Sequence, residues 1–574
     1  MYIRPNFRKK NGKRHAYWDL VESYRTPRGP RQRVVAYLGR LDEKGRLGVK
    51  RSAEGGSYFR QREAFGEVEP EWVEVDASGV RTENQREFGG PWLGLELMRA
   101  VGLQEFLERT IRSGQEEIPW WLMGLVLVLC RLCHPSSELE IAEHFYRGSA
   151  LPELVGVPRE KVNEQRLYRG LDAMLPHKGA LEEFLKNRLG RLFDLKYDLL
   201  LYDITSTYFE GEAKGNALAQ RGHSRDHRGD CKQVCIGLVV SKCGMPLGYE
   251  VFAGNRSDVT TLREMVEGME RRYGKADRIW VVDRGVVSEG NMEFLQLEGR
   301  RYIVGTPRGK LKEFEAELLG EDWRAIREGL EVKLCPSPSG QETLILCRSR
   351  DRREKEKGMH ERFERRIEEG LKKMESSCGK RKYKVTTIAK RVGRLLGKNS
   401  RAAGLFKTDV SQDGEGRARL IWKKDEAWRE WANLSEGCYV LRSNVREWSA
   451  EELWGAYMQL TEAEAAFRIE KSDLCIRPIW HQKADRVQAH ILVCFLAYVL
   501  WKTLGQICTR SGLGDEPRRV FAELSKINVV DVVLPTRQGV VIRKRCITRP
   551  TDHQEILLQR LGLRLPSRIE TTEM

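Results

Sequence analysis

Apolar and polar positions follow different periods along the chain, and these periods divide it into consecutive segments. The pieces HAYWDLVES and QRVVAYLG alternate as β-strands do and are joined by the turn-rich YRTPRGPR. Residues 1–88 are therefore predicted to form a basic β-rich domain with a linker. In residues 89–194 the apolar positions recur every three or four residues instead, which predicts a helical domain.

Residues 195–310 change to a strand pattern. The runs DLLLYDITSTYF, KQVCIGLVVS and GMPLGYEVFAG predict three closely spaced strands. An amphipathic helix is then expected from Ser257 to Gly274, followed by the strand RIWVVD, the helix SEGNMEFLQLEG and the strand RYIVGTP. Three antiparallel strands and then helix, strand, helix and strand are the order of an RNase H-like mixed sheet flanked by helices.

Three further segments complete the chain. Residues 311–448 are predicted to be an insertion that interrupts the core and contains strands near its end. Its charged middle, residues 348–407, predicts an exposed helix of mixed charge, with DNA contact as the equal alternative. Residues 449–512 begin with a Ser-x-x-Glu capping pattern and are predicted to supply the final core helices, before a C-terminal extension at 513–574. The predicted fold class is α/β, mixed α+β overall.

Composition narrows the class of partner. Lys and Arg outnumber Asp and Glu by 100 − 83 = 17, which favours a polyanionic partner, with nucleic acid as the first candidate. The apolar stretches Trp120–Cys133 and His490–Trp501 are shorter than the roughly 20 residues of a bilayer crossing, so no membrane segment is expected. Thirteen scattered cysteines without an export signal indicate reduced thiols in the cytoplasm.

Three carboxylates stand in positions that suit metal-dependent chemistry. Asp203 and Asp283 interrupt or end apolar runs that otherwise read as buried strands, and Glu464 lies on a later helical stretch. A carboxylate in such a place is costly unless it is paired or coordinated. In the predicted sheet the first and fourth strands are neighbours, so Asp203 and Asp283 could converge, with Glu464 reaching them from a helix. Oxygen ligands of this kind hold pairs of divalent cations about 4 Å apart at phosphoryl-transfer sites.

Each acid also has an ordinary explanation. Asp203 could cap a turn, Asp283 could open the loop RGVVSEGN, and Glu464 could form an ion pair with Arg468 one turn later. Only the combination of the three points to chemistry.

In these motifs the sequence resembles the DDE transposases of bacterial insertion sequences, in the branch with a β-containing insertion. The resemblance covers about residues 90–510 and is carried by YDITSTYFEG, HSRDHRGDCKQVCIGLVVSKCGMPLGYEVFAGNRSD, VVDRG and YMQLTEAEAAFRIEK with IRPIWHQKADRVQAHI. Family members have a Tyr-x2-Arg-x3-Glu-x6-Lys signature. Tyr457, Glu464 and Lys471 match it, but Leu460 occupies the arginine position, so the phosphate-binding role of that arginine is absent or falls to Arg468.

The resemblance implies the roles of the site residues. Asp203, Asp283 and Glu464 would be catalytic and would coordinate Mg²⁺, as two ions that Mn²⁺ can replace. DNA-binding roles would fall to the side chains Tyr457, Arg468, Lys471 and Arg284. The partners would be double-stranded DNA, as terminal inverted repeats and target, and a second copy of the chain in a homodimeric synaptic complex. The expected location is the bacterial cytoplasm, at the nucleoid, without a membrane.

The leading functional hypothesis is cut-and-paste transposition, in which transposon ends are cleaved and joined to target DNA. The first rival is a nuclease with the same core that hydrolyses DNA without strand transfer. The second is a catalytically silent, transposase-derived DNA-binding protein. In the leading hypothesis, residues 1–88 and the helical domain 89–194 are candidates for end recognition, although the helices could equally well only support the core.

Other polar and aromatic residues are weaker candidates. The loop residues His223, Asp226, His227 and Asp230 resemble a metal cluster, but a structural or DNA-facing loop is favoured. Trp422 or Trp448 could stack on an extruded base.

Overall fold

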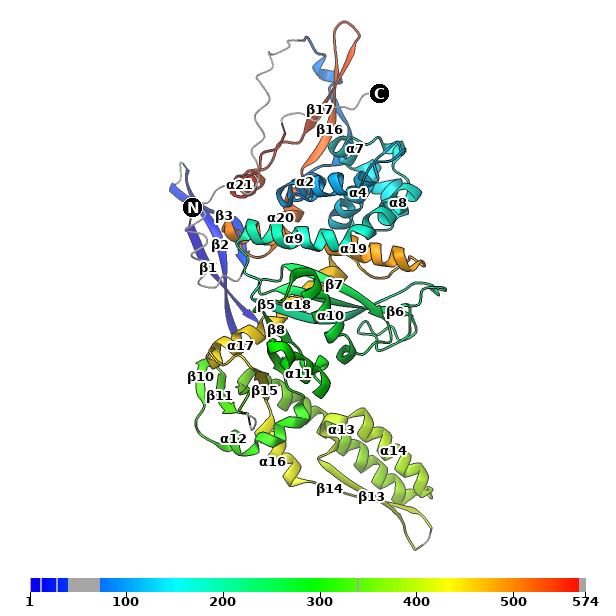
Figure 1. The fold of residues 1–574 in the computed structure, drawn as a ribbon, viewed down its shortest axis with the longest axis vertical. Helices are drawn as coiled ribbons and strands as arrows, with labels where there is room; N and C mark the ends of the chain where they lie inside the picture. The colour runs from blue at the N-terminus through cyan, green and yellow to red at the C-terminus, as the bar shows by residue number, and fades with distance from the viewer. Residues whose placement is uncertain are drawn as a thin grey trace. The chain divides into compact units, whose positions relative to one another are not determined.

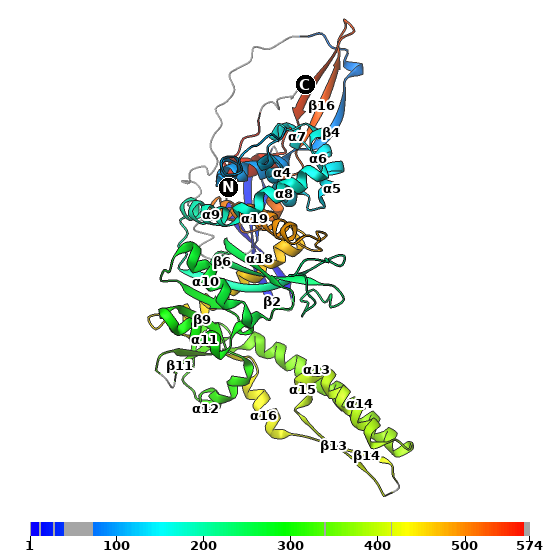
Figure 2. The ribbon, with the colours of Figure 1, turned by 45° about the vertical axis from the view of Figure 1, so that its right-hand side comes forward.

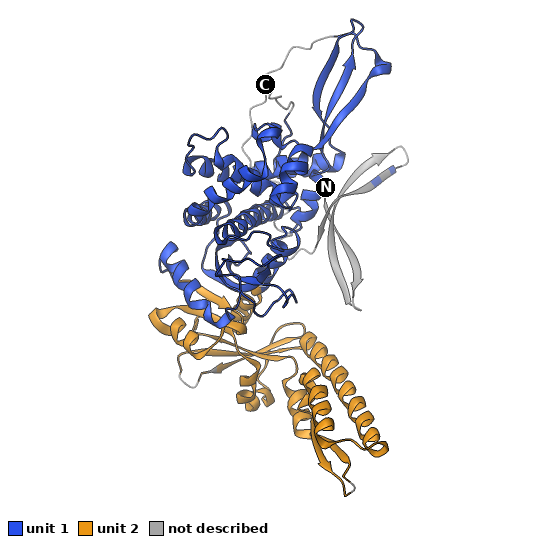
Figure 3. Ribbon diagram, turned by 90° about the vertical axis from the view of Figure 1, so that its right-hand side faces the viewer, with its two compact units in different colours: residues 1–276, 461–574 blue, residues 277–460 orange. Residues whose placement is uncertain are grey.

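The computed structural model describes residues 2–10, 13–26, 29–39, 73–337, 340–414 and 416–566. It divides into two compact units, unit 1 with residues 1–276 and 461–574, and unit 2 with residues 277–460 (Figure 3). Each unit contains both helices and strands, and the order of elements after residue 195 is the predicted one. The predicted mixed α/β fold class is therefore confirmed.

Unit 1 contains the three antiparallel strands expected after residue 195. They are β5 (Leu199–Tyr208), β6 (Gln233–Ser241) and β7 (Pro246–Ala253), with β6 in the middle. Every residue of β6 is buried, because helices cover the hairpin. On one side lies α10 (Leu262–Tyr273), where Tyr202 Oη donates a hydrogen bond of 2.8 Å to Thr261 Oγ1.

The helices of unit 1 surround one long apolar helix, α19 (Ala484–Arg510), which packs against α2, α4 and α8 (Figure 1). By length and hydropathy α19 could cross a bilayer, but 83% of its most apolar window is buried inside the protein. It is the core helix that the sequence predicted, although it begins before His490 and ends after Trp501. Besides α10 and α18 (Leu460–Ser472), the described helices of unit 1 include α2 (Gly89–Val101), α3 (Leu103–Thr110), α4 (Trp120–Cys133), α5 (Glu138–Glu140), α6 (Tyr146–Gly148), α7 (Leu151–Val155), α8 (Glu164–Met174), α9 (Lys178–Phe193), α20 (Pro517–Leu524) and α21 (Asp552–Leu561).

Two small antiparallel sheets complete unit 1. The first consists of β1, β2 and β3, and the two predicted strands HAYWDLVES and QRVVAYLG fall in β2 and β3. The second joins β4 to the C-terminal strands in the order β17-β16-β4, so the C-terminal extension pairs with a strand that precedes the helical segment. The bounds are β1 (Tyr2–Lys10), β2 (Lys13–Thr26), β3 (Gly29–Gly39), β4 (Arg81–Glu87), β16 (Asn528–Pro535) and β17 (Val541–Ile547).

Among the described residues, the larger sheet of unit 2 has six strands in the order β10-β11-β12-β15-β9-β8. β8 and β9 are parallel and are connected through α11, whereas the remaining neighbours are antiparallel. The insertion thus adds β10, β11, β12 and β15 to the sheet of β8 and β9, whereas the strand pattern predicted only that the insertion contains strands near its end. The bounds are β8 (Ile279–Val282), α11 (Glu289–Gln296), β9 (Arg301–Gly305), α12 (Glu315–Leu319), β10 (Arg324–Arg327), β11 (Leu330–Pro336), β12 (Thr343–Ser349), α16 (Glu426–Ser435), β15 (Cys438–Ser443) and α17 (Ala450–Met458).

The charged middle of the insertion forms a second packed cluster in unit 2. The helices α13 (Arg350–Lys380), α14 (Val385–Lys398) and α15 (Ser400–Ala403) pack with the hairpin of β13 (Phe406–Gln412) and β14 (Ala418–Lys424) (Figure 2). An apolar stripe of α13 is buried here, with Ile367, Leu371 and Met374 at its centre. Its other faces form ion pairs, as expected for a helix of mixed charge, but the predicted exposed helix is divided into three helices with a buried stripe.

Two predicted helices differ in detail. The capping box of Ser449 and Glu452 is formed, but the helix it opens ends at Met458, and α18 (Leu460–Ser472) follows after a turn at Gln459. The helix expected to begin at Ser257 begins instead as one 3₁₀ turn, with α10 starting at Leu262. Nothing in the local sequence explains the turn at Gln459.

Candidate active site

Asp203 lies in the middle of β5, directly opposite Leu238 of β6. It is half-buried, whereas the other residues from Leu199 to Thr207 are buried. Its Oδ1 accepts a hydrogen bond of 2.8 Å from the amide of Ile204. A strand that is otherwise core thus holds one acidic side chain on a rigid backbone, and the turn-cap explanation of Asp203 does not apply.

Asp283 and Tyr457 are brought together in unit 2. Asp283 directly follows β8, whose four residues are buried, and its carboxylate Oδ1 accepts a hydrogen bond of 3.1 Å from Tyr457 Oη. Burial, and then the charge of Asp283, raise the pKa of Tyr457, so the phenol remains a donor. A Cβ at Gly305, the last residue of β9, would collide with this phenol, so the glycine leaves the space that Tyr457 occupies.

Glu464 is exposed on α18, a helix that is fixed near both ends in unit 1. Near its start, Glu462 pairs with Lys502 of α19 at 3.3 Å. A Cβ at Gly244, in the β6–β7 turn, would lie only 2.6 Å from Glu462 Oε2. Near its end, Lys471 pairs with Asp226, in the loop before β6. α18 therefore runs in the same direction as β5, the strand that carries Asp203.

The face of α18 that carries Glu464 also carries Lys471, because the two residues are seven positions apart. Among the residues that the structure describes, Glu464 forms no ion pair with Arg468, so the ordinary explanation of Glu464 is not realised. Arg468 is itself exposed, as is Arg284 directly after Asp283. Both remain candidates for DNA contact.

Asp226 is the buried acceptor of two cations. Its Oδ1 lies 2.9 Å from Lys471 Nζ and also pairs with Arg477, while only 4% of its side chain is exposed. Burial lowers the pKa of Lys471, and Asp226 opposes this effect. The Lys471 side chain therefore lies against a protein carboxylate here, and its predicted contact with DNA phosphates stays a prediction.

The rest of the loop around Asp226 is also held by ion pairs. Arg225 donates two hydrogen bonds of 2.6 Å to the carboxylate of Asp258, and Arg228 pairs with Asp230 at 2.9 Å. Within the described residues, the group His223, Asp226, His227 and Asp230 is not one that could hold a metal ion. These contacts favour the structural interpretation of the loop over a second metal site.

The tryptophans proposed for base stacking lie in different surroundings. Trp422 packs against Phe406, and its Nε1 donates to Glu375 at 3.0 Å, whereas Trp448 is half-buried. The more exposed indole is Trp480, which is 64% exposed just after the Arg477–Pro478 peptide. Sequence reasoning missed Trp480 because its exposure depends on the burial of its neighbours Ile479 and His481.

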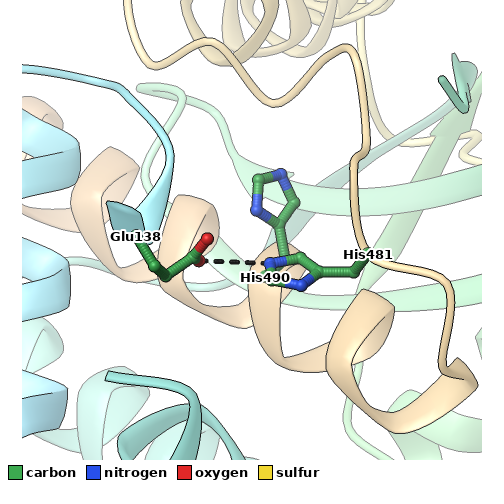
Figure 4. A group of neighbouring side chains, drawn as sticks. All are labelled: Glu138, His481 and His490. Atoms are coloured by element: carbon green, nitrogen blue, oxygen red, sulfur yellow. Dashed lines mark hydrogen bonds and ion pairs between the residues drawn. The ribbon is translucent and has the colours of Figure 1, made fainter. Parts of the chain in front are cut away.

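A buried group that the sequence did not indicate consists of Glu138, His481 and His490 (Figure 4). His481 Nε2 lies 3.1 Å from Glu138 Oε1. His490 Nε2 donates to the Ile476 carbonyl at 3.1 Å, and its Nδ1 accepts from Arg131 at 3.4 Å. Burial and the charge of Arg131 lower the pKa of His490 to about 3. Burial acts to raise the pKa of Glu138, but the hydrogen bond and charge of His481 outweigh burial and lower this pKa to about 2.

By their spacing, these three residues could hold a metal ion. However, both ring nitrogens of His490 already have hydrogen-bond partners, and the guanidinium of Arg131 would repel a cation. Mg²⁺ also prefers oxygen ligands. We therefore assign the group to the attachment of the segment before α19, where it fixes His481 and Ile476. The predicted metal ligands Asp203, Asp283 and Glu464 are carboxylates, the type of ligand that Mg²⁺ prefers.

Two family models match parts of the chain. Residues 194–500 match the model of the transposase DDE domain, and residues 3–64 match that of the IS1634 family transposase N-terminal domain. No curated protein matches the chain. Among solved structures, the chain is similar to the cryo-EM structure of the piggyBac transposase synaptic complex with hairpin DNA, with a TM-score of 0.34 and 8% identity. That match covers 79% of this chain and 83% of the other.

Proposed function

This chain belongs to the DDE transposases of insertion sequences, and on this premise we propose that it moves DNA by a cut-and-paste route. The observation that carries the proposal is Asp203, a half-buried acid in the middle of a buried strand within the matched DDE domain. Asp283 at the end of β8 and Glu464 on α18 complete the proposed catalytic set.

The proposed cofactor is Mg²⁺, as two ions that Mn²⁺ can replace, held by Asp203, Asp283 and Glu464. When bound, such ions favour attack by an oxygen nucleophile and stabilise the leaving oxygen at a phosphodiester. The chain positions its own groups for this task. β5 fixes the backbone of Asp203, and the hydrogen bond from Tyr457 orients the carboxylate of Asp283.

The proposed reaction has two stages. Water attacks the phosphodiester at each transposon end, and the bond that breaks leaves a free 3′ hydroxyl. That hydroxyl then attacks further phosphodiesters, first to release the element and later to join it to target DNA. In the joining step one phosphodiester is exchanged for another, so no external energy source is required.

The proposed partner is double-stranded DNA, as terminal inverted repeats and as target, bound by a homodimer in the synaptic complex within the bacterial nucleoid. The excess of 17 positive charges supports a polyanionic partner. Exposed Arg284 and Arg468 stand beside two of the proposed catalytic acids and are expected to contact phosphates. Residues 1–88 and 89–194 are proposed for end recognition and support of the core.

The proposal is tested by exchanging each carboxylate for the uncharged side chain of the same shape. Asp203→Asn, Asp283→Asn and Glu464→Gln should each slow Mg²⁺-dependent end cleavage by roughly a thousandfold or more, because each removes a cation ligand. Binding to the ends should be nearly unchanged. Cleavage is measured on labelled transposon-end duplexes, and binding by fluorescence anisotropy.

A matched control is Glu462→Gln. It removes a carboxylate from the same helix as Glu464, but this carboxylate is paired with Lys502 and is not one of the proposed metal ligands. It should cleave normally. Normal cleavage by any of the three catalytic variants would refute that assignment. If the wild-type protein cleaves ends but does not join precut ends to target DNA, it is a nuclease; if it only binds ends, it is a silent DNA-binding protein.

A further inference from the structure

Unit 2 has an arginine-lined hollow away from the proposed catalytic acids in sequence. It has a volume of about 730 Å³ and is formed by the β10–β11 hairpin, the end of β12 and the first turn of α13. We call it the arginine groove after the four side chains that characterise it. These are Arg327, Arg348, Arg350 and Arg353.

Two of these guanidinium groups are held on indole rings. The Arg327 Cζ lies 4.6 Å from the ring centroid of Trp454, and the Arg348 Cζ lies 4.4 Å from that of Trp323. Trp454 is itself fixed, because its Nε1 donates to Tyr439 Oη at 2.7 Å. A guanidinium stacked on an aromatic ring keeps its N–H edges for hydrogen bonding, so less freedom is lost when a ligand binds.

The groove has an excess of positive charge. Its carboxylates are Glu331, which pairs with Arg348 at 2.7 Å, and Glu328, which pairs with Arg350 at 3.0 Å. Among the described residues, neither Arg327 nor Arg353 has a carboxylate partner; Arg353 donates only to the Asn433 carbonyl at 3.4 Å. Four arginines against two glutamates leave a net charge of 4 − 2 = +2 along the lining.

The charge pairs in the groove do not compete strongly with an incoming anion. The side chains of Arg350 and Glu328 are 52% and 90% exposed, and ion pairs in such positions contribute little. Most residues that line the groove are arginine, glutamate or serine, and its apolar side chains are those of Ala325 and Ile326. Planar guanidinium groups match the oxygens of a phosphodiester in pairs.

We propose that the arginine groove binds backbone phosphates of duplex DNA. This inference rests on the proposed function and assigns to unit 2 a DNA-binding surface that depends on charge and not on base sequence. Arg327 and Arg353 bind the phosphates and carry the net positive charge, while Arg348 and Arg350 are neutralised by their glutamate partners.

The experiment compares two double variants that remove the same charge. Arg327→Gln with Arg353→Gln alters the groove. Arg324→Gln with Lys355→Gln alters one exposed residue on the same strand, β10, and one on the same helix, α13, neither of which lines the groove. The full-length variants are compared with wild-type protein for binding to a labelled transposon-end duplex across a range of NaCl concentrations, after thermal unfolding has shown that each is folded.

The groove variant should bind roughly tenfold more weakly, and its slope of log affinity against log salt should be smaller by about one for each phosphate that is no longer neutralised, hence by about two. The control variant should change the affinity by less than about threefold, since it only alters the long-range field. Restoring charge with Arg327→Lys and Arg353→Lys should recover part of the affinity, because lysine keeps the charge but not the paired donors.

Equal affinities and slopes for the groove and control variants would overturn the proposal. A second result would also overturn the proposal: wild-type protein binds inorganic phosphate, the groove variant does not, and both bind DNA equally well. The groove would then be a site for small anions. The cleavage assay with Asp203→Asn reports separately on the proposed function. Failure of the wild-type protein to bind DNA at all would overturn both.

Discussion

At the scale of single residues, Asp226 joins two separate segments of unit 1 through its ion pairs. Its carboxylate is buried, accepts from Lys471 and Arg477, and has one oxygen, Oδ2, without a hydrogen-bond partner in the structure. A buried carboxylate is stabilising only while its partners remain in place. Asp226 therefore ties the end of α18 to the loop before β6.

Asp226→Asn should destabilise the protein by about 3 kcal/mol, because Lys471 and Arg477 lose their counter-charge in a place with little access to water. The measurement is unfolding in urea, followed by circular dichroism. The control is Asp230→Asn, which breaks an ion pair whose side chains are 36% and 66% exposed and should change stability much less than Asp226→Asn does.

Equal stabilities of these two variants would contradict the structural role of Asp226. A variant that is stable but unable to cleave DNA would instead assign Asp226 to the reaction.

Glu470 is a second buried acid on α18, and it makes stability depend on pH. Burial raises its pKa from 4.5 to about 8, with Lys471 opposing the change. The folded protein therefore holds a proton on Glu470 between these two values, whereas the unfolded chain does not. Stability from this site is fully present below pH 4.5 and is lost as the pH rises towards and through about 8.

Glu470→Gln removes this titration and mimics the protonated form. The stability of the variant relative to wild type should increase steadily from pH 5 to pH 8, and the increase should level off above about 8. Urea unfolding of both proteins over this pH range gives the difference directly, since other titrating groups are common to both. A difference that does not change with pH would show that Glu470 is ionised when folded.

At the scale of elements, α13 shows how one helix serves two environments. Much of its length is exposed and charged, while its apolar stripe packs against α14. Three glycines lie within it, and they differ in what surrounds them. A Cβ at Gly358 would meet nothing within 4 Å, whereas one at Gly370 would lie 2.6 Å from Leu395 Cδ2 of α14.

Gly358→Ala should therefore stabilise unit 2 by about 0.5–1 kcal/mol, because alanine loses less backbone entropy than glycine in a helix. Gly370→Ala gains the same helix propensity but forces Leu395 to move, so its net effect should be smaller or destabilising. Urea unfolding of the two variants provides the comparison. Equal stabilisation by both would mean that α13 packs against α14 more loosely than the structure shows.

For residues 449–472 the periodicity of the sequence predicted a helical segment, but it did not predict where each helix ends. The capping box of Ser449 and Glu452 could be predicted from the sequence because both residues lie within four positions of each other. The turn at Gln459 could not be predicted, since Leu453, Leu460 and Phe467 lie at seven-residue spacing on both sides of it. Local signals thus located the start of the helix but not its interruption.

At the scale of the whole molecule, DNA binding and DNA cleavage should respond to different changes in conditions. The excess of 17 positive charges is spread over the chain, whereas the proposed reaction needs only three carboxylates. DNA binding should therefore weaken steeply with salt, with a log–log slope of about −0.9 per phosphate neutralised. A chelator of divalent cations should stop cleavage while binding to the ends changes little.

Both effects can be measured on one labelled duplex, by anisotropy for binding and by gel electrophoresis for cleavage. Titration with Mg²⁺ or Mn²⁺ should restore cleavage after chelation. Cleavage that persists in the chelator would contradict a metal-dependent mechanism. Binding that is insensitive to salt would contradict an interface made mainly through phosphates.

The sequence by itself determined the type and order of the elements, the family, and the strand and helix contexts of Asp203, Asp283 and Glu464. All of these depend on neighbours within a few turns or strands, where periodicity is informative. The tertiary structure alone decided which distant groups meet. Lys471 and Asp226 are 245 residues apart, His481 and Glu138 are 343 apart, and Asn84 and Asp531 are 447 apart. Such pairs form because packing brings them together, and no local period encodes that packing.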